Sequence, residues 1–466
     1  MPDHDGATAY EQARQLIEDG APADLPRAAE LAMNAHRGGV PGAGVLYATC
    51  IDRMSLISGR PQRFGTVTLH HQGDLVMAPV ADPVGDVERA ALGVPSLAEL
   101  RAEAERANRA LAVERADDPG LPAGQRFVRI WTDPTPAELQ RRWDAEGQEA
   151  WADDDALTVV CRGGHPGVML GPVFQMPMWR VGDEDLFALM VRVERLPEAV
   201  FSYSFWPIDA AGQVHRSFGE AEGRWRGPDA PPPAPSNREL LGTTFDHAVE
   251  SAALGEPRVV TVYRPPDHER SETLPVVYAT DGGMFAPYAR RVDAAIEAGL
   301  IPRVLVVAAH SAGFRQGNLR ALEYLPGFDD DRFDRHQRFF VGELAAWAEA
   351  ELGASTDRSE RAVFGCSDGG GHALATGRLH RDRFGHVIAY STGMAPEPGD
   401  LWDPATAPFV HLCAGTLEGP FFQATEAWAA WLHLTDVAHH FTERVCGHDV
   451  LQWCEELPAA VQRAWG

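Results

Sequence analysis

From about residue 237 to the C-terminus, short apolar runs alternate with helical segments that have one apolar face. Short apolar runs between turn residues are typical of strands that are buried on both faces of a parallel sheet. The pattern therefore predicts an α/β domain with a mostly parallel, doubly wound sheet. The expected strands are 258–263, 275–279, 304–309, 362–365, 386–390, 409–414 and 439–444.

A different pattern runs through residues 119–227, where short apolar or alternating segments are separated by turns. Short strands at regular spacing predict a β-sandwich-like domain. The aromatic residues Trp179, Phe187 and Trp206 would suit either a ligand-binding face or a hydrophobic core, and we expect core packing. The expected strands are 127–131, 157–161, 187–193 and 200–206.

Residues 1–118 combine helical and strand patterns, which predicts a small α+β domain of unknown role. Ser96 and Glu99 form a capping box, which marks the start of a helix. The stretch 59–66, with Asp52 and Arg53 before it, resembles an uncharacterised bacterial domain. The expected elements are helices 10–17 and 97–114 and strands 65–70 and 75–80, with a turn at 72–74.

A length of 466 residues predicts about three domains at roughly 150 residues each. A break at 117–122 separates the first two, and the proline-rich stretch 228–239 predicts a semi-rigid linker before the third. The predicted domains are 1–118, 119–227 and 240–466.

The charge balance of 41 basic and 67 acidic residues gives a net charge of −26. A chain this acidic cannot use phosphate neutralisation to bind nucleic acid, and it is repelled by anionic membranes. We therefore expect a small-molecule partner. The oligomeric state cannot be deduced from the sequence.

The six cysteines are sparse, and no Cys or His spacing resembles a zinc site. We expect no metal and no cofactor. The chain begins without a basic segment followed by an apolar run, and it has no long apolar stretch. These features predict a cytoplasmic protein with reduced thiols.

One predicted strand leads into a glycine-rich turn that carries a serine. Gly365-Cys366-Ser367-Asp368-Gly369 fits the pattern Gly-x-Ser-x-Gly, with strand residues 361–364 before it and a helical run 372–376 after it. This context is that of a nucleophile elbow, which holds the serine in a strained conformation with its oxygen exposed. The alternative is a plain glycine-rich turn, because the chain has 45 glycines. The flanking elements favour the elbow.

An acid and a base follow the serine in the chain order that this fold requires. Glu418 comes after the strand 409–414, and His448 comes after the last strand and before a helix. The histidine would accept the proton of Ser367, and the glutamate would orient the ring. Asp449 and Asp436 are the alternative orienting acids.

The developing oxyanion needs backbone N–H donors. We expect one from Asp368, the residue after the nucleophile, and one from the loop that carries Gly282 and Gly283. Glycines allow the backbone to approach the substrate there. Side chains that intrude at either glycine should reduce turnover.

The C-terminal region resembles the Putative esterase family, which includes the enterochelin (enterobactin) esterases and is a branch of the α/β-hydrolases. The pieces that carry the resemblance are 278–283, 298–302, 320–324, 365–370, 414–418 and 447–453. The resemblance implies an α/β-hydrolase domain preceded by a β-sandwich, and an ester substrate of the siderophore trilactone type. Residues 1–118 are an addition to the family pattern, and Cys366 and Asp368 depart from it.

Arg320, His310 and Arg315 are candidate substrate-pocket residues, and His372 is a weaker candidate. Arg320 with Glu323 resembles a family feature, and a structural ion pair between the two is an equal alternative. Cys446 lies near His448, and we expect a buried, unreactive thiol there.

These observations predict a serine esterase that hydrolyses carboxylic esters through an acyl-enzyme. A deacylase of sugar esters and an acyltransferase share the same residues and stay open. A non-catalytic ligand-binding or scaffold protein is the alternative from another class.

Overall fold

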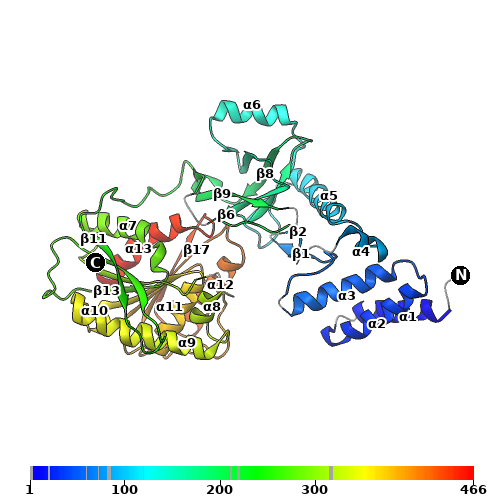
Figure 1. The fold of residues 1–466 in the computed structure, drawn as a ribbon. Helices are drawn as coiled ribbons and strands as arrows, with labels where there is room; N and C mark the ends of the chain where they lie inside the picture. Colours follow the sequence, from blue (N-terminus) through cyan, green and yellow to red (C-terminus); the bar gives the residue numbers. More distant parts are fainter. Residues whose placement is uncertain are drawn as a thin grey trace. The chain divides into compact units, whose positions relative to one another are not determined.

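The computed structural model describes residues 4–18, 21–58, 60–71, 73–80, 85–118, 120–209, 212–217, 221–313 and 318–466 (Figure 1). The chain packs as two compact units. The first comprises residues 1–196 and 203–223, and the second comprises 197–202 and 224–466. The three-domain division predicted from the sequence stays a prediction, and its boundary at 118 lies within the first unit.

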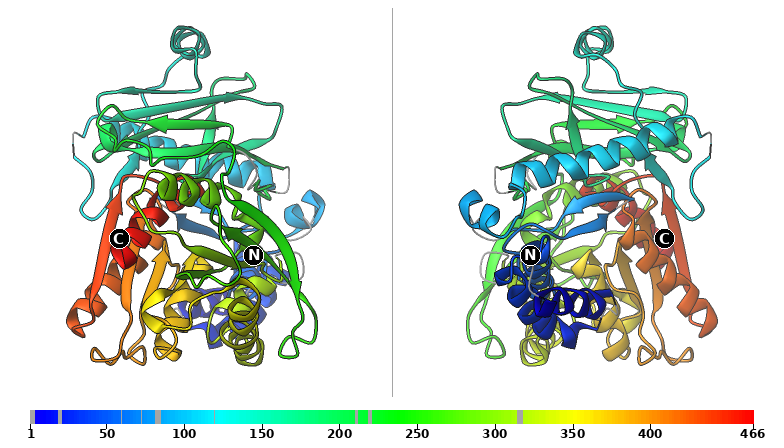
Figure 2. Two further views of the ribbon diagram at one scale, coloured as in Figure 1. Left: turned by 90° about the vertical axis from the view of Figure 1, so that its left-hand side faces the viewer. Right: turned by 90° about the vertical axis from the view of Figure 1, so that its right-hand side faces the viewer.

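The first unit begins with three helices that pack side by side, coloured dark blue (Figures 1 and 2). The predicted capping box is present, because Ser96 and Glu99 bond each other's backbone N–H groups at the start of α5. The elements up to α5 are α1 (His4–Glu18), η1 (Pro22–Asp24), α2 (Leu25–Arg37), α3 (Ala43–Ile57), β1 (Thr68–His71), β2 (Asp74–Met77), α4 (Asp86–Ala91) and α5 (Leu97–Ala116).

A second sheet has the strand order β10-β9-β6-β7-β8-β5-β4, with β3 paired to β8, and the pairs among β3 to β9 are antiparallel. Residues 200–202 of β9 and 224–226 of β10 belong to the second unit. Hydrogen bonds connect these strands into a single sheet, so the strand pairing does not define the two separate sheets of a sandwich. The predicted β-sandwich therefore stays a prediction. The elements are β3 (Phe127–Arg129), α6 (Pro136–Glu146), β4 (Ala150–Asp153), β5 (Ala156–Arg162), β6 (Gly167–Pro172), β7 (Met176–Arg180), β8 (Leu186–Val193), η2 (Leu196–Glu198), β9 (Val200–Ile208) and β10 (Gly223–Arg226).

The aromatic residues of this sheet are core residues, as predicted. Trp179, Phe187 and Trp206 are all at most 3 % exposed. The Trp179 ring also packs edge-on against Trp131. None of the three offers a free face to a ligand.

The second unit is built on an eight-stranded sheet in the order β11-β12-β14-β13-β15-β16-β17-β18. β12 is antiparallel to both its neighbours, and the remaining pairs are parallel. All the strands predicted for this region are present. The strands are β11 (Thr243–Val249), β12 (Arg258–Arg264), β13 (Val276–Ala279), β14 (Leu305–Ala309), β15 (Arg361–Cys366), β16 (His386–Tyr390), β17 (Phe409–Gly415) and β18 (His439–Arg444).

The edge strand β11 was not predicted, because its side chains are mostly exposed and form no apolar run. The helical segments of the unit are η3 (Gly282–Met284), α7 (Ala286–Glu297), α8 (Leu319–Tyr324), α9 (Asp330–Gln337), the π-helical η4 (Arg338–Leu344), α10 (Ala345–Leu352), η5 (Arg358–Glu360), α11 (Asp368–Leu379), α12 (Pro420–Leu434) and α13 (Val450–Trp465).

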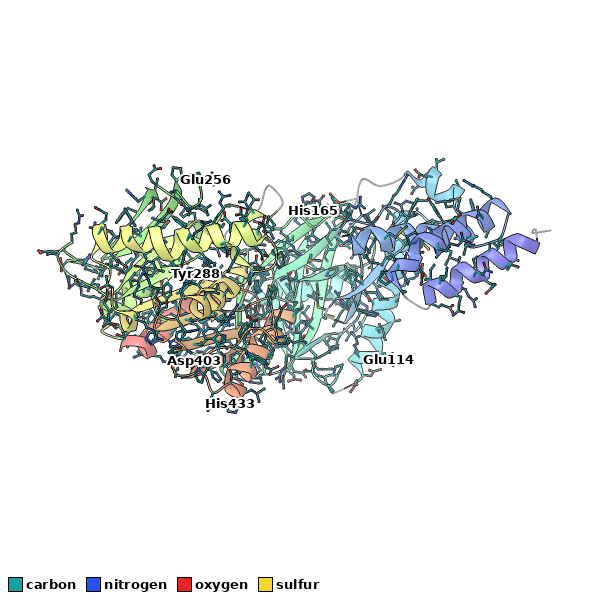
Figure 3. All side chains as sticks on the ribbon, turned by 90° about the horizontal axis from the view of Figure 1, so that it is seen from below. Glu114, His165, Glu256, Tyr288, Asp403 and His433 are labelled. Atoms are coloured by element: carbon teal, nitrogen blue, oxygen red, sulfur yellow. The ribbon has the colours of Figure 1, made fainter. Side chains whose placement is uncertain are left out.

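Helices cover both faces of this sheet, as the buried strands require. Tyr278 packs with one hydrophobic cluster, which α10, α11 and α12 complete, and its neighbour Val277 packs with the other, which α7 and α13 complete. Tyr288 of α7 is 6 % exposed within the second cluster, whereas Glu256, Asp403 and His433 are exposed (Figure 3). The fold is therefore α/β in this unit, as predicted.

Among the residues that the structure describes, no helix combines the length and the apolar character needed to cross a bilayer.

Candidate active site

Ser367 lies at a sharp turn between β15 and α11. Its backbone has φ 59° and ψ −127°, a region that non-glycine residues rarely adopt. A Cβ at Gly365 would lie 2.0 Å from the carbonyl oxygen of Gly369, and a Cβ at Gly369 would lie 2.3 Å from Thr280 Oγ1. Both positions therefore exclude side chains, and the strained turn has the geometry expected of a nucleophile elbow.

Glu418 and His448 form a close pair. The distance between His448 Nδ1 and Glu418 Oε2 is 2.6 Å, and the glutamate side chain is fully buried. The other carboxylate oxygen, Oε1, accepts hydrogen bonds from Ser391 Oγ and from the backbone N–H of Gly415. A carboxylate held in this way fixes the orientation and the tautomer of the imidazole ring.

Aromatic residues hold the His448 ring from two sides. Phe421 stacks on it with ring centres 3.9 Å apart, and Trp453 meets it edge-on at 4.7 Å. Trp453 Nε1 donates to Ser391 Oγ at 2.7 Å, which in turn donates to Glu418. Phe421, Trp453 and Ser391 were not predicted from the sequence. The position of Ser391 directly after β16 was the only available signal.

The three predicted residues follow the carboxyl ends of parallel strands in one sheet. Ser367 follows β15, Glu418 follows β17 and His448 follows β18. Ligand sites of open α/β sheets lie at this edge. Within the described part of the chain, no hydrogen bond links Ser367 Oγ to His448, and the His448 side chain is 14 % exposed.

The two alternative acids are placed elsewhere. Asp449 is 2 % exposed, accepts hydrogen bonds from the backbone N–H and the hydroxyl of Ser202, and caps α13 through Leu451 N. Asp436 is exposed in the turn before β18. Glu418 is therefore the acid that contacts the ring of His448.

The predicted oxyanion donors lie on two loops. Gly282 and Gly283 form η3 directly after β13, and Asp368 is the first residue of α11. A Cβ at Gly282 would lie 2.1 Å from the carbonyl oxygen of Ala308, whereas a Cβ at Gly283 would make only ordinary contact with His310. The predicted steric sensitivity therefore has a structural basis at Gly282 alone.

Arg320 joins these two loops, and we call Asp281, Arg320 and Asp368 the arginine clamp. Nε and Nη2 of Arg320 each donate to Asp281 at 2.8 Å, and Nη1 donates to Asp368 Oδ2. Arg320 is 5 % exposed, and the two carboxylates hold the pKa of its guanidinium above the usual value despite burial. Its role as a substrate-pocket residue stays a prediction.

The ion pair considered between Arg320 and Glu323 is not formed. Glu323 instead makes a bidentate pair with Arg258, at 2.8 and 3.0 Å. Of the other pocket candidates, His310 contacts Thr261 Oγ1 at 2.9 Å and His372 is fully buried. Burial lowers the pKa of both rings. Arg315 lies outside the described residues.

Cys446 is a buried thiol, as expected. Burial, reinforced by the charge of Glu418, raises its pKa well above the usual value. Its sulfur lies against Gln452 Oε1. A thiol held in its neutral form is a poor nucleophile, so the site has Ser367 as its nucleophile candidate.

Comparison with known proteins identifies a family match and similar folds. Residues 251–440 match the family described as Putative esterase. The enterobactin esterase of Shigella flexneri, solved in the presence of enterobactin, is 18 % identical with a TM-score of 0.53, over 70 % of this chain and 98 % of that chain.

The ferric enterobactin esterase of Salmonella typhimurium is 19 % identical with a TM-score of 0.54, over 70 % of this chain and 98 % of that chain. A comparison with curated proteins finds no match. At these low identities, the structural similarity shows a shared fold. Residues 251–440 thus match the family described as Putative esterase, within a chain that shares the fold of the enterobactin esterases.

Proposed function

We propose that the protein is a serine hydrolase that cleaves carboxylic esters through an acyl-enzyme on Ser367. The observation that carries the proposal is the fully buried Glu418, 2.6 Å from His448, at the sheet edge where the strained Ser367 also lies. A paired acid and imidazole at the end of the sheet that bears the nucleophile is the arrangement that acyl transfer needs.

In the first half of the reaction, His448 Nε2 accepts the proton of Ser367 as the serine oxygen bonds to the ester carbonyl carbon. The tetrahedral intermediate collapses, the ester C–O bond breaks, and His448 returns the proton to the departing alcohol. Water then repeats the sequence on the acyl-enzyme and releases the acid. Glu418 stays ionised and stabilises the imidazolium in both halves.

Backbone N–H groups of Asp368 and of the Gly282-Gly283 loop would hold the negative charge of the carbonyl oxygen. Asp368 N begins α11, where helix N–H groups have no partner within the helix. The arginine clamp fixes the spacing between the two loops, because one guanidinium contacts a carboxylate on each.

A siderophore trilactone of the enterobactin type is the first substrate to test, because the solved structures with this fold include enterobactin esterases. An acyltransferase and a deacylase of sugar esters would use the same residues. They differ in whether water or another alcohol intercepts the acyl-enzyme.

Labelling with a fluorophosphonate tests the proposal. Wild-type protein and the exposed control variant Ser359→Ala should both be labelled, and Ser367→Ala should not. Hydrolysis of 4-nitrophenyl acetate should follow the same order. A wild-type protein that resists the reagent, or equal labelling of Ser367→Ala, would contradict the esterase and favour a ligand-binding protein.

A further inference from the structure

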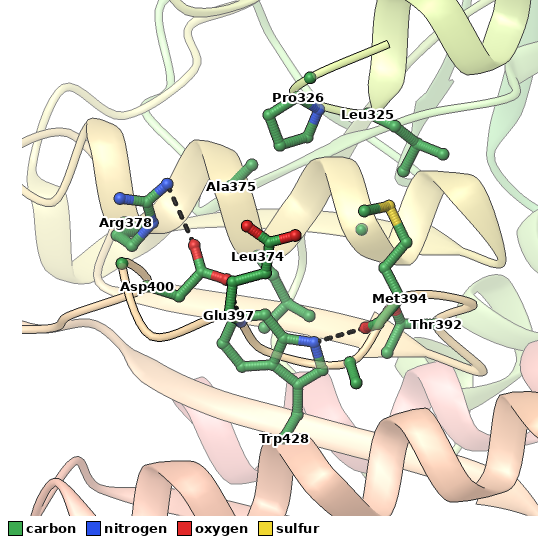
Figure 4. Close-up of a pocket in the computed structure, with 14 residues that line it drawn as sticks. Leu325, Pro326, Leu374, Ala375, Arg378, Thr392, Met394, Glu397, Asp400 and Trp428 are labelled. Carbon is green, nitrogen blue, oxygen red and sulfur yellow. Dashed lines mark hydrogen bonds and ion pairs between the residues drawn. The ribbon is translucent and has the colours of Figure 1, made fainter. Parts of the chain in front are cut away.

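A pocket of about 320 Å³ lies beside α11 in the second unit (Figure 4). Pockets that bind small molecules begin at about this size, roughly 300 Å³. Its walls come from the loop after α8, from α11 and α12, and from the loop after β16. The apolar wall residues are Leu325, Leu374, Ala375, Met394 and Trp428.

The pocket begins one helical turn from Ser367. Gly371 lines it, and the backbone N–H of Gly371 donates to the carbonyl oxygen of Ser367 at 3.2 Å. Thr392 lies beside Gly371, since a Cβ at Gly371 would be 3.8 Å from Thr392 Oγ1. Thr392 directly follows Ser391, which donates to Glu418. Two lining residues of the pocket are therefore linked to the proposed catalytic residues, one through the backbone of Ser367 and one through Ser391.

Thr392 supplies a buried hydroxyl that has no partner in the described part of the chain. Its side chain is fully buried, it lines the pocket, and Oγ1 makes no hydrogen bond to any described residue. An unsatisfied buried hydroxyl destabilises a fold, so such a group calls for an explanation. A ligand atom that exchanges a hydrogen bond with Thr392 provides one.

The far end of the pocket is acidic. Arg378 pairs with Asp400 at 3.3 Å, and Asp400 also accepts from the backbone N–H of Glu397. The Glu397 carboxylate lines the same wall and has no ion-pair partner among the described residues. The local charge is therefore negative, which disfavours an anionic ligand.

Three large apolar residues that follow lining residues in sequence are exposed. Phe328 is 56 % exposed, Leu379 is 48 % exposed and Leu401 is 66 % exposed. They follow the lining residues Gly327, Arg378 and Asp400 in sequence. Exposed apolar groups beside a pocket favour an apolar ligand.

We propose that this pocket is the subsite for one uncharged, apolar group of the ester substrate, about the size of a single ring, which forms a hydrogen bond with Thr392. The group is held by Leu325, Leu374, Met394 and Trp428, while Glu397 excludes anionic groups. This inference rests on the proposed function, since it assigns the pocket to the substrate of Ser367.

Binding is tested first, without catalysis, by methyl NMR of the full chain with ¹³C-methyl methionine. Phenol or cyclohexanol should shift the Met394 resonance, which is identified by its loss in Met394→Leu. Benzoate at the same concentration should shift it much less. Thr392→Val should weaken phenol binding by about 3- to 10-fold, the effect of one neutral hydrogen bond.

Thr442→Val is the matched control, because Thr442 Oγ1 is also buried without a partner but lies outside the pocket. It should leave phenol binding unchanged. Neutral probes that fail to shift Met394, benzoate that binds as well as phenol, or an unchanged dissociation constant in Thr392→Val would each overturn the assignment.

Catalysis then tests the link to Ser367. Ala375→Leu adds bulk to the pocket wall, so the ratio of kcat/KM for a phenylacetyl ester to that for an acetyl ester should fall by at least about 5-fold. An unchanged ratio in a protein labelled by fluorophosphonate overturns the subsite alone. Absent labelling, with phenol still bound at Met394, overturns the esterase instead.

Discussion

Two groups of carboxylates follow strands of the second unit, and they contact different kinds of partner. Glu418 contacts His448, an imidazole of the kind that serves as a general base. Asp281 and Asp368 contact Arg320, a group that stays charged. The first group can therefore serve proton transfer, whereas the arginine clamp can only hold its loops in place.

The largest difference between the two groups should appear in kcat when the Glu418 carboxylate is replaced by an uncharged amide of the same shape. Glu418→Gln should lower kcat by about 10³- to 10⁴-fold, because an amide no longer selects the tautomer that accepts the serine proton. Steady-state kinetics on a nitrophenyl ester measures the effect.

Asp449→Asn is the matched control for Glu418→Gln. Asp449 adjoins His448 in sequence but bonds Ser202 and Leu451 N, so its change should lower the unfolding midpoint and affect kcat far less. Equal losses of kcat in Glu418→Gln and Asp449→Asn would contradict the assignment of Glu418, and not Asp449, as the orienting acid.

At the arginine clamp, removal of the positive charge should mainly lower the stability of the fold. Arg320→Met leaves two mostly buried carboxylates facing each other, and we expect a loss of about 3 kcal/mol in the free energy of unfolding. Urea denaturation measures it. Adding Asp368→Asn to Arg320→Met should restore part of that stability, and a further loss would show that repulsion is not the cause.

The loop after β13 offers a smaller, steric test. Gly282→Ala would place a methyl group against the backbone of Ala308, so it should cost about 1–3 kcal/mol and reduce turnover. Gly283→Ala has room beside His310 and should stay within about 0.5 kcal/mol of the wild type. Thermal unfolding and ester hydrolysis of the two variants distinguish them, and equal effects would contradict the steric account.

The last test concerns a histidine whose surroundings differ from those of His448. Burial, and to a lesser extent Arg258, lowers the pKa of His336 to about 3. Because the unfolded chain binds a proton near pH 6.5 and the folded chain does not, stability should fall below that pH by about 1.4 kcal/mol per pH unit, down to about pH 3.

His336→Phe should remove this part of the acid sensitivity. The His336 ring nitrogens make no hydrogen bonds to the described residues, so the phenyl ring loses none. Urea unfolding between pH 5 and 7 measures the slope, with the exposed His433→Gln as control. A slope unchanged by His336→Phe would assign the acid sensitivity to other groups.

The sequence allowed prediction of elements and residues that are marked by local pattern. Most of the parallel strands are apolar runs, and the order of Ser367, Glu418 and His448 after strand ends follows a rule of the fold. Their catalytic roles stay predictions. The edge strand β11 was missed because its faces are mostly exposed.

Contacts between distant segments could not be predicted. Glu323 follows Arg320 by one helical turn, which favours a local pair, yet Glu323 binds Arg258 of β12 and Arg320 binds two loops. Likewise, no local sequence pattern predicts the hydrogen bond from Trp453 to Ser391. Such partners depend on how strands and helices pack, and residues that are neighbours in sequence do not predict that packing.

Residues 197–202 pack with the second unit, although the proline-rich stretch at 228–239 comes later in the chain. Val200 N donates to the carbonyl oxygen of Val445, and Ser202 holds Asp449, beside the proposed base. A fragment cut at the prolines would lack both supports. Anyone seeking an independently folding catalytic piece should therefore begin it before Pro197.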